Sequence, residues 1–346
     1  MGYTSAKAMN TSYNLDSTNL ALGSFILVSF LVGMAMNGLL LWLLWKKMGR
    51  TVNTLWFLHL TLSFLISCCS LPFFGVYNLL NFHWVFDVFM CKITYFFLTL
   101  GMVSTVFLLT IISLDRYLLT CRPIWAQHNR SIPLACRLII GVWLVSLVVT
   151  APYLAFSVTQ EVGKDKSVCK LNYTSDKWNG DQMELAIFMT RFLLTFLLPF
   201  FIIVFCYCSM RQEMKKKRLL RTGKPFKILV IAVASFFIFR FPFYLYMISS
   251  LANKPNPPGK IQEFLRITFS IGICLNICFT PILYLFVGEN FKQVFKTSIV
   301  VLVKKGFTEH SIMSMENMSL RAETIQTSSS SNLELAKTQR DDLPPS

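Results

Sequence analysis

The chain has 346 residues, of which 54% are hydrophobic and 14% charged, and its formal net charge is +16 at pH 7. A soluble domain normally carries about a quarter of charged residues, so this balance argues against a soluble protein and indicates a membrane protein. The basic residues cluster in short segments between apolar runs, which favours membrane topology over nucleic acid as the origin of the charge.

Seven apolar segments are long enough to cross a bilayer as helices, which takes roughly 20 residues each. They are residues 20–45, 55–80, 93–119, 134–157, 185–210, 226–252 and 264–287. The sequence therefore predicts an all-α membrane protein with a seven-transmembrane helix bundle over residues 20–287. Residues 1–19 are polar and lack the apolar core of a cleavable signal, so they are expected to form an extracellular N-terminal segment.

The segment after the last span differs in character. Residues 288–305 place Phe291, Phe295 and Ile299 on one helical face, which predicts a short amphipathic eighth helix along the membrane surface. Residues 306–346 are polar and are predicted to be a disordered cytoplasmic tail. Its candidate phosphorylation sites are Thr327, Ser328, Ser329, Ser330 and Ser331.

The basic residues of the short loops predict the orientation of the bundle. The loop after the fifth span is the most basic, with Glu213 as its single acid. Its basic residues are Arg211, Lys215, Lys216, Lys217, Arg218, Arg221, Lys224 and Lys227. The loops after the first and third spans also carry basic residues without acids, whereas the alternate loops are mixed. The N-terminus is therefore expected outside the cell and the C-terminus inside, in a plasma membrane whose lipids are themselves partners.

Two further features agree with this orientation. Glycosylation sequons at Asn10 and Asn172 fall in segments assigned to the outside, whereas one at Asn129 falls inside and should stay unmodified. Of the 10 cysteines, only Cys91 and Cys169 lie on the oxidising side, which makes them the expected disulfide. The other cysteines are expected to be buried or cytosolic thiols.

The motifs, taken in chain order, resemble the rhodopsin-class (class A) G-protein-coupled receptors over residues 20–305. Asp115, Arg116 and Tyr117 match the third-helix motif of that class. Further landmarks are Asn37, Gly38, Leu71, Pro72, Pro123, Trp143, Pro199, Tyr207 and Pro242. The strings RPIWAQHNRS, GKPFK and LYLFVGENFK are similar to the chemoattractant receptor branch, of the formyl peptide and chemerin type, with the chain as an orphan member.

This resemblance implies a switch at the inner end of the bundle. In the class, the arginine is held by its neighbouring acid at rest, and on activation it turns to form the floor of a pocket for the G protein's terminal helix. The implied switch residues are Asp115, Arg116, Tyr117, Tyr207 and Tyr284. From the residues alone, Asp115 and Arg116 could instead be interfacial charges that reach the lipid headgroups.

Three positions depart from the class. Phe64 stands where an aspartate usually forms the centre of a sodium site, so that site is expected to be absent. Arg240 replaces the tryptophan of span six, two residues before the pivot Pro242, and Thr280 replaces the asparagine of span seven. A cation near mid-bilayer costs a few kcal/mol and needs a partner. Backbone carbonyls, Asn276, water and an anionic ligand group are the candidates, and Arg240 is expected to act either in the structure and its switch or in ligand contact.

The candidate ligand site lies in the outer half of the bundle. Arg191 is eight residues before Pro199, slightly over two helical turns. Several chemoattractant receptors have arginine here to meet a peptide carboxylate, which suits the bidentate geometry of guanidinium. Thr99 stands where formyl peptide receptors have an acid, so their pocket is not reproduced. The expected ligand-binding residues are Arg191, Thr99 and Arg240, and the alternative for Arg191 is an arginine that reaches outward to headgroups.

These features predict a receptor that binds an extracellular peptide or anionic lipid mediator and activates a heterotrimeric G protein of the inhibitory type. A phosphorylated tail would recruit arrestin. One alternative is a non-signalling decoy receptor, favoured by Phe64, Arg240 and Thr280. A transporter is the other, but the sequence has no internal repeat of the kind that transporters carry. Since the sequence contains no metal-ligand cluster, nucleotide loop or nucleophile–base pair, no enzyme, metal site, cofactor or nucleic-acid partner is predicted.

Overall fold

The computed structural model describes residues 17–46, 48–163, 166–176, 179–217, 224–252 and 259–287. The side chains of residues 224–229 and 279–287 lie outside this description. All described residues belong to one compact unit that ends at Gly288. The predicted eighth helix, the tail with its hydroxyl cluster, and Asn10 lie outside the described residues.

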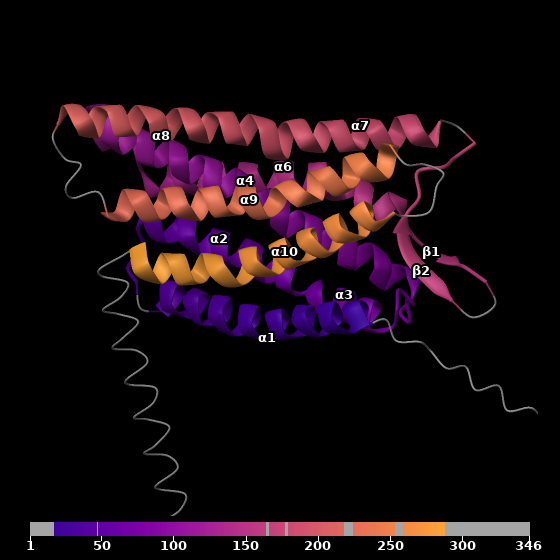
Figure 1. Ribbon diagram of the computed structural model, residues 1–346. Coiled ribbons are helices and arrows are strands. Elements are labelled where there is room, and N and C mark those ends of the chain that lie inside the picture. Colours follow the sequence, from indigo (N-terminus) through magenta and orange to yellow (C-terminus); the bar gives the residue numbers. More distant parts are fainter. Residues whose placement is uncertain are drawn as a thin grey trace, which may run out of the picture. The chain divides into compact units, whose positions relative to one another are not determined.

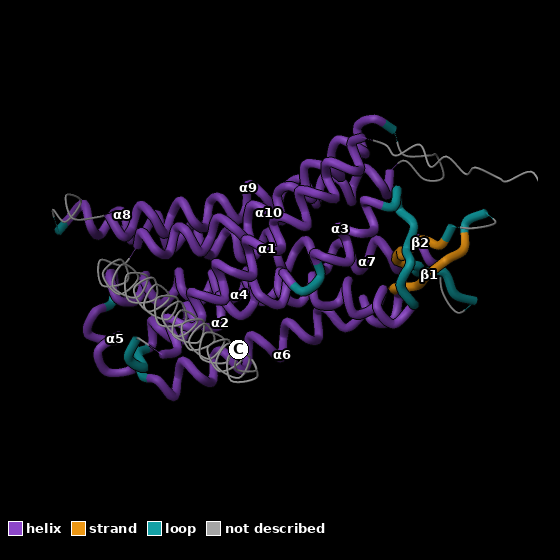
Figure 2. Tube along the Cα trace, turned by 90° about the horizontal axis from the view of Figure 1, so that it is seen from below, coloured by secondary structure: helices purple, strands orange, loops and turns teal. Residues whose placement is uncertain are grey.

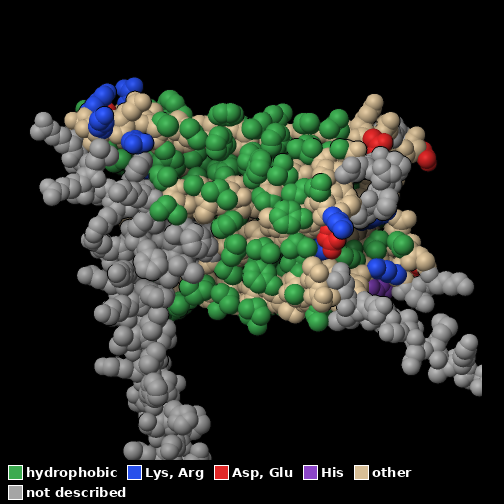
Figure 3. All heavy atoms as spheres, viewed as in Figure 1, with side chains coloured by type: hydrophobic (Ala, Val, Ile, Leu, Met, Phe, Trp, Pro, Cys, Tyr) green, Lys and Arg blue, Asp and Glu red, His purple; other side chains and the backbone are tan. Residues whose placement is uncertain are grey.

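The predicted fold class is confirmed, because 7 helical segments are long and apolar enough to cross a membrane. The helices are α1 (Ser17–Lys46), α2 (Val52–Cys68), α3 (Leu71–Leu79), α4 (Val88–Cys121), α6 (Ile132–Phe156), α7 (Gly180–Phe192), α8 (Leu198–Lys216), α9 (Lys224–Ala252) and α10 (Lys260–Val287). They run alongside one another (Figure 1), and the visible charged side chains gather at the two ends while apolar ones cover the middle (Figure 3). A helix bundle in a bilayer needs this distribution, because its middle faces lipid tails.

α4 is the central helix of the bundle. Of its most apolar window, 67% is buried, against 22% for α6. Gly101 allows α4 to approach α2 closely, since a Cβ atom there would lie 2.4 Å from the carbonyl oxygen of Ser63. Small residues at helix contacts permit such approach in membranes, where packing holds helices together. The polar residues of α4 therefore lie deep between the helices and away from lipid.

Two of the spans are interrupted next to a proline. The second span is divided into α2 and α3 at Cys69 and Ser70, and Pro72 stands in the first turn of α3. Proline has no backbone N–H and clashes with the carbonyl four residues earlier, so the helix cannot pass through unchanged. In the fifth span, the π-helical turn η1 (Leu193–Leu197) precedes Pro199 and joins α7 to α8.

The fifth span is also longer than predicted. It runs from Gly180 to Lys216, whereas the apolar run in the sequence predicted a span over residues 185–210. The side chain of Asn179 accepts a hydrogen bond from the backbone N–H of Asp181 at 2.9 Å, which caps the helix N-terminus in the polar loop. The helix therefore starts where its cap stands and not where the apolar run begins.

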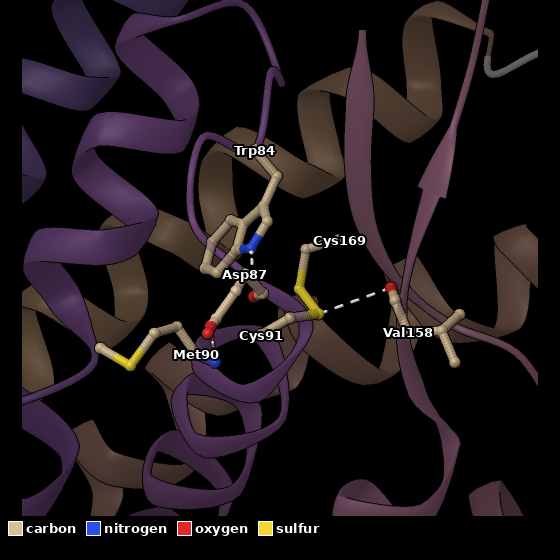
Figure 4. The surroundings of a disulfide bond; sticks show 6 residues. All are labelled: Trp84, Asp87, Met90, Cys91, Val158 and Cys169. Atoms are coloured by element: carbon tan, nitrogen blue, oxygen red, sulfur yellow. Dashed lines mark hydrogen bonds between the residues drawn. A yellow bond between two sulfur atoms is a disulfide. The ribbon is translucent and has the colours of Figure 1, made fainter.

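A β-hairpin covers one end of the bundle, beyond α3 and α7 (Figures 1 and 2), and was not predicted. Strands β1 (Ser157–Glu161) and β2 (Ser167–Leu171) pair antiparallel, with Ser157 opposite Leu171. The expected disulfide between Cys91 and Cys169 is present and ties β2 to the start of α4 (Figure 4). The backbone N–H of Trp84 donates to the Ser167 carbonyl at 2.7 Å and adds a second attachment. The hairpin is thus held against the helices at this end. At the opposite end, the short helix α5 (Pro123–Asn129) follows α4.

Candidate functional site

A cavity of about 430 Å³ lies between the hairpin and the helices. This volume falls within the range of small-molecule and cofactor sites, about 300–1,000 Å³. Its aromatic lining is Phe74, Tyr77, Phe82, Tyr95, Tyr153, Tyr173, Phe243, Tyr246 and Phe269. Its charged lining has three basic side chains, Lys170, Arg191 and Arg266, and one acidic side chain, Glu184. The formal charge of the lining is therefore +2 (three minus one), which favours an anionic ligand.

Arg191 is the most buried of these three cations, and one of its N–H groups remains available as a hydrogen-bond donor. It comes from α7, its relative exposure is 7%, and its Nη1 donates to the hydroxyl of Tyr153. Its Cζ atom lies 4.6 Å from the centroid of the Phe243 ring, a cation–π contact. Among the described residues, its Nε–H has no hydrogen-bond partner. Arg191 thus faces the cavity rather than the headgroups and retains a donor for an anion.

Thr99 and Arg240 have different positions relative to this cavity. Thr99 is 3% exposed and contributes to the lining, as expected. Arg240 is not part of that lining, so its expected contact with a ligand stays a prediction that this cavity does not support. Its Nη1 donates to the sulfur of Met102 and its Cζ lies 5.1 Å from the Phe243 ring centroid. Arg240 therefore lies outside this lining, next to Met102 and the same Phe243 ring that Arg191 contacts.

Arg266 is a second cavity cation, which the sequence argument did not single out. Its Nη1 donates to Asn78 and its Nη2 to Asn19, each at 3.0 Å, and its Cζ lies 4.6 Å from the centroid of the Phe82 ring. The available signal was an arginine at the outer start of the last span. In the same region, burial raises the pKa of the Tyr173 phenol, so this hydroxyl stays neutral at physiological pH and can donate a hydrogen bond.

A polar cluster at the end opposite the hairpin, the predicted inner end, contains the implied switch, with different partners from those expected. Asp115 is 9% exposed and is paired with Arg130, whose Nε donates to Oδ1 at 2.7 Å and whose Nη2 donates to Oδ2 at 3.1 Å. Arg116 donates instead to Oδ1 of Asn53 at 2.9 Å. The same oxygen accepts from Arg130 at 2.6 Å.

The expected contact between Asp115 and Arg116 is therefore wrong as a hydrogen-bonded pair. Successive residues of an α-helix point about 100° apart, since one turn takes 3.6 residues, so the two side chains leave α4 in different directions. Arg130 follows α5 and presents a planar fork that matches the carboxylate. Asn53 and Arg130 were missed because only the folded chain brings α2, α4 and the segment after α5 together.

The remaining switch candidates lie near this cluster or outside the described side chains. The ring of Tyr117 is 5.8 Å from that of Phe205 on α8, measured between centroids. Tyr207 packs against the main apolar core, and its hydroxyl interacts with Ser113. Pro242 lies inside α9. The side chain of Tyr284 is outside the described part of α10.

Replacement of Arg130 by alanine is expected to lower the thermal stability of the protein. It would leave Asp115 as a nearly buried carboxylate without its cation, which costs 3–5 kcal/mol for a fully buried pair and about 2 kcal/mol here, since Arg130 is 23% exposed. The expected fall in melting temperature of the purified protein in detergent is roughly 5 °C.

The exposed Arg137, also at the inner end, provides the matched control. Arg137→Ala removes the same charge and should change the stability by less than about 0.5 kcal/mol. Adding Asp115→Asn to Arg130→Ala should recover part of the loss, because no unpaired charge remains. Equal losses in the single and double variants would contradict a stabilising ion pair.

Comparison with known proteins places this arrangement in a family. Residues 36–284 match the family described as 7 transmembrane receptor (rhodopsin family). The chain belongs to this family. It is 39% identical over 310 residues to the Probable G-protein coupled receptor 33 of Homo sapiens, covering 87% of this chain and 92% of the relative. It is 34% identical to the Chemerin-like receptor 1 of Rattus norvegicus over 80% of this chain and 77% of the relative. The C3a anaphylatoxin chemotactic receptor of Oncorhynchus mykiss is 32% identical, over 82% and 78% respectively.

These likenesses confirm the recognition made on the motifs, including the chemoattractant type. The receptor is a multi-pass protein of the plasma membrane, its family signals through G proteins, and its members are not enzymes. The cavity at the hairpin end and the polar cluster at the other end are therefore the candidate ligand site and the candidate G-protein site.

Proposed function

We propose that the receptor is a chemoattractant receptor that binds an extracellular peptide or anionic lipid mediator in the 430 Å³ cavity and activates a heterotrimeric G protein of the inhibitory type. The carboxylate of the ligand contacts Arg191. The observation that carries the proposal is this buried guanidinium, 7% exposed, which lines the cavity and is not part of any ion pair among the described residues.

Burial makes Arg191 a strong anchor for an anion. A guanidinium does not lose its proton in proteins, so it remains charged inside the bundle. Its contacts with Tyr153 and with the Phe243 ring satisfy it only in part, because neither bears a full negative charge. A ligand carboxylate supplies that charge and accepts paired hydrogen bonds in the geometry that suits arginine. The relatives named for chemerin and C3a anaphylatoxin support a peptide as the first class to test.

The basic residues at the inner end support contact with the G protein and with anionic lipid. Arg211, Lys215 and Lys216 are exposed near the end of α8, and Glu213 pairs with Lys217 at 3.2 Å. Such clusters attract anionic headgroups by about 1 kcal/mol per cation near the surface. The tail residues Thr327 to Ser331, once phosphorylated, supply the charge for arrestin.

If the hairpin end lies outside the cell, Asn172 is accessible to glycosylation and is expected to carry a glycan. Asn172 is exposed just beyond β2, and its side-chain oxygen accepts a hydrogen bond from the Thr174 backbone N–H at 3.1 Å. The test uses a receptor that already carries Asn10→Gln, in which glycosidase treatment should still increase the gel mobility. Adding Thr174→Ala should abolish this response to the glycosidase. Thr174→Ser should retain it, because serine also completes the sequon.

The sequon at Asn129 gives the opposite check. Asn129 is exposed at the other end of the bundle, as the last residue of α5. With the N-terminus outside, Asn129→Gln changes nothing in the mobility. A glycan at Asn129 would mean that the orientation is reversed.

The proposed function is tested by nucleotide exchange on purified heterotrimers. Membranes with the receptor are mixed with inhibitory-type or stimulatory-type G protein, and chemerin, C3a anaphylatoxin or a library of peptides with free C-terminal carboxylates is added. Exchange on the inhibitory type that rises with peptide supports the proposal. Exchange on the stimulatory type alone would overturn its G-protein assignment.

A decoy receptor gives a different pattern of peptide binding and nucleotide exchange, which is measured on cells that express the receptor and on their membranes. It would bind and internalise the peptide while exchange on every G protein stays at the level of membranes without receptor. Arg240, which stands in the core of span six, is the structural feature that motivates this comparison. Binding without exchange would therefore replace the signalling proposal with the decoy.

A further inference from the structure

A second, much smaller cavity lies next to the larger one, with which it shares Met102 and Ile273 in its lining. Its volume is about 20 Å³, which exceeds the 10–15 Å³ that one water molecule needs but leaves no room for a polyatomic ion such as phosphate. Its lining comes from α2, α4, α9 and α10 and consists of Phe64, Ser67, Met102, Thr105, Phe236, Arg240, Ile273, Asn276 and Ile277. The described lining contains one cation and no acid.

Arg240 is a charged group that this environment does not neutralise. Its relative exposure is 4%, and the described ion pairs do not include it. It donates to the thioether of Met102, which is a weak acceptor. Its other near neighbours are the Phe243 ring and the hydroxyl of Tyr244. These groups are all formally neutral, and the nearest charged group that acts on Arg240 is a second cation, Arg191. Among the described residues, the positive charge of Arg240 therefore has no compensating anion.

The electrostatic cost of burying the Arg240 charge indicates whether an ion or a water molecule occupies the cavity. An isolated ion transferred into a medium of low dielectric loses tens of kcal/mol of solvation in the idealised limit, and proteins avoid this by neutralising or pairing the group. Arginine cannot be neutralised by loss of a proton. Water would hydrate the guanidinium but would leave the charge in place. An anion in the adjacent cavity accepts the hydrogen bonds of the guanidinium and also compensates its positive charge.

The other polar residues of the lining can contribute donors to an anion. Thr105 donates to the Gly101 carbonyl at 2.7 Å and its hydroxyl oxygen lies 2.8 Å from that of Ser63, while Ser67 donates to the Ser63 carbonyl at 3.3 Å. The two acceptors that are backbone carbonyls lie one turn earlier on the same helix, so rotation of either hydroxyl toward the cavity does not break the helix. Asn276 lines the cavity from α10, and its side-chain amide is 3.5 Å from the Phe236 carbonyl, a long contact.

We propose that this cavity is a binding site for a monovalent anion of the size of chloride, held by Arg240 and by the hydroxyl of Thr105. The anion joins α4 and α9, with Ser67 on α2 and Asn276 on α10 closing the site. Phe64 occupies the position at which family members usually carry an acid, and it lines the same cavity. In this chain, an anion site thus takes the place of the cation site that is usual in the family. This inference is independent of the ligand that binds in the outer cavity.

The direct test is the thermal stability of the purified receptor as a function of chloride. Sodium chloride is replaced stepwise by sodium gluconate at a constant ionic strength of about 150 mM, because gluconate is too large for the cavity. The melting temperature is expected to rise by roughly 2–5 °C from gluconate to chloride, with a saturable dependence. Bromide should replace chloride. Replacement of sodium by N-methylglucamine at constant chloride should have no effect.

Two variants locate the effect at this site. Arg240→Gln keeps a polar side chain without the charge and should abolish the dependence on chloride. Thr105→Val keeps the shape without the hydroxyl and should raise the chloride concentration at half-maximal effect roughly fivefold or more. Thr105→Val also keeps the test decisive if Arg240→Gln does not fold.

Arg191→Gln provides the matched control, because it removes a second buried guanidinium from the neighbouring, larger cavity. It should retain the full dependence on chloride. A melting temperature that does not respond to chloride, that follows sodium, or that loses its chloride response in Arg191→Gln and not in Arg240→Gln, would overturn the proposal.

Discussion

Replacement of Arg116 by alanine is expected to abolish nucleotide exchange on the G protein while ligand binding at the outer cavity is retained. Arg116 lies at the inner end of α4 and donates to Asn53 at 2.9 Å, whereas Asp115 is occupied by Arg130. A single neutral acceptor is weaker than a carboxylate, so Arg116 can leave Asn53 at modest cost. Under the proposed function, Arg116 supplies charged donors to the G protein in the active state. Alanine removes them, and exchange should fall to the level of membranes without receptor.

Arg122 gives the matched control for this experiment. It is exposed at the end of the same helix, so Arg122→Ala removes one positive charge from the same face without removing Arg116. Exchange by Arg122→Ala should stay close to that of wild type at equal surface expression. Asn53→Ala, which removes the acceptor of Arg116, should raise exchange in the absence of ligand. Retained exchange in Arg116→Ala would show that the inner cluster is structural and that the G protein binds elsewhere.

The seven spans were predictable because a bilayer imposes a length and a composition on each helix. The disulfide was predictable because the orientation leaves Cys91 and Cys169 alone on the oxidising side. Helix ends were predicted less well, because caps such as Asn179 set them in polar segments where hydropathy carries no signal. The prolines at the two interrupted spans were visible in the sequence, but the helices respond to them differently. The helix breaks before Pro72, whereas it forms a π-helical turn before Pro199. Such responses depend on the neighbouring helices.

Side-chain partners were the hardest part to predict. Asp115 could be assigned to the inner end from its motif, but its cation is 15 residues away, beyond α5. Asn53, which accepts from both arginines, is 63 residues from Arg116 and belongs to another helix. Neither contact has a local sequence signal. The distance from Pro199 placed Arg191 about two turns away toward the hairpin end, and it lines the cavity there, although a π-helical turn lies between the two residues.

Replacement of Arg191 by glutamine is expected to weaken the binding of a peptide with a free C-terminal carboxylate about 100-fold, or about 2.8 kcal/mol. Hydrogen bonds to charged groups contribute about 1.5–3 kcal/mol, and the site is shielded from water. Arg191→Lys keeps the charge but loses the planar fork, so an intermediate loss of roughly tenfold is expected. The measurement is displacement of a labelled peptide, found by the exchange screen, from membranes that carry each variant.

The partner of Arg191 on the ligand is identified by changing both sides. A peptide with a C-terminal carboxamide should lose about 100-fold on the wild-type receptor and little on Arg191→Gln, because the interaction is already absent there. Arg266→Gln is the control in the same cavity. Its guanidinium is already bonded to Asn78 and Asn19, so its loss should penalise the carboxylate and the carboxamide equally. If the preference for the carboxylate disappears in Arg266→Gln and persists in Arg191→Gln, the anchor is at the start of α10 and the role assigned to Arg191 is wrong.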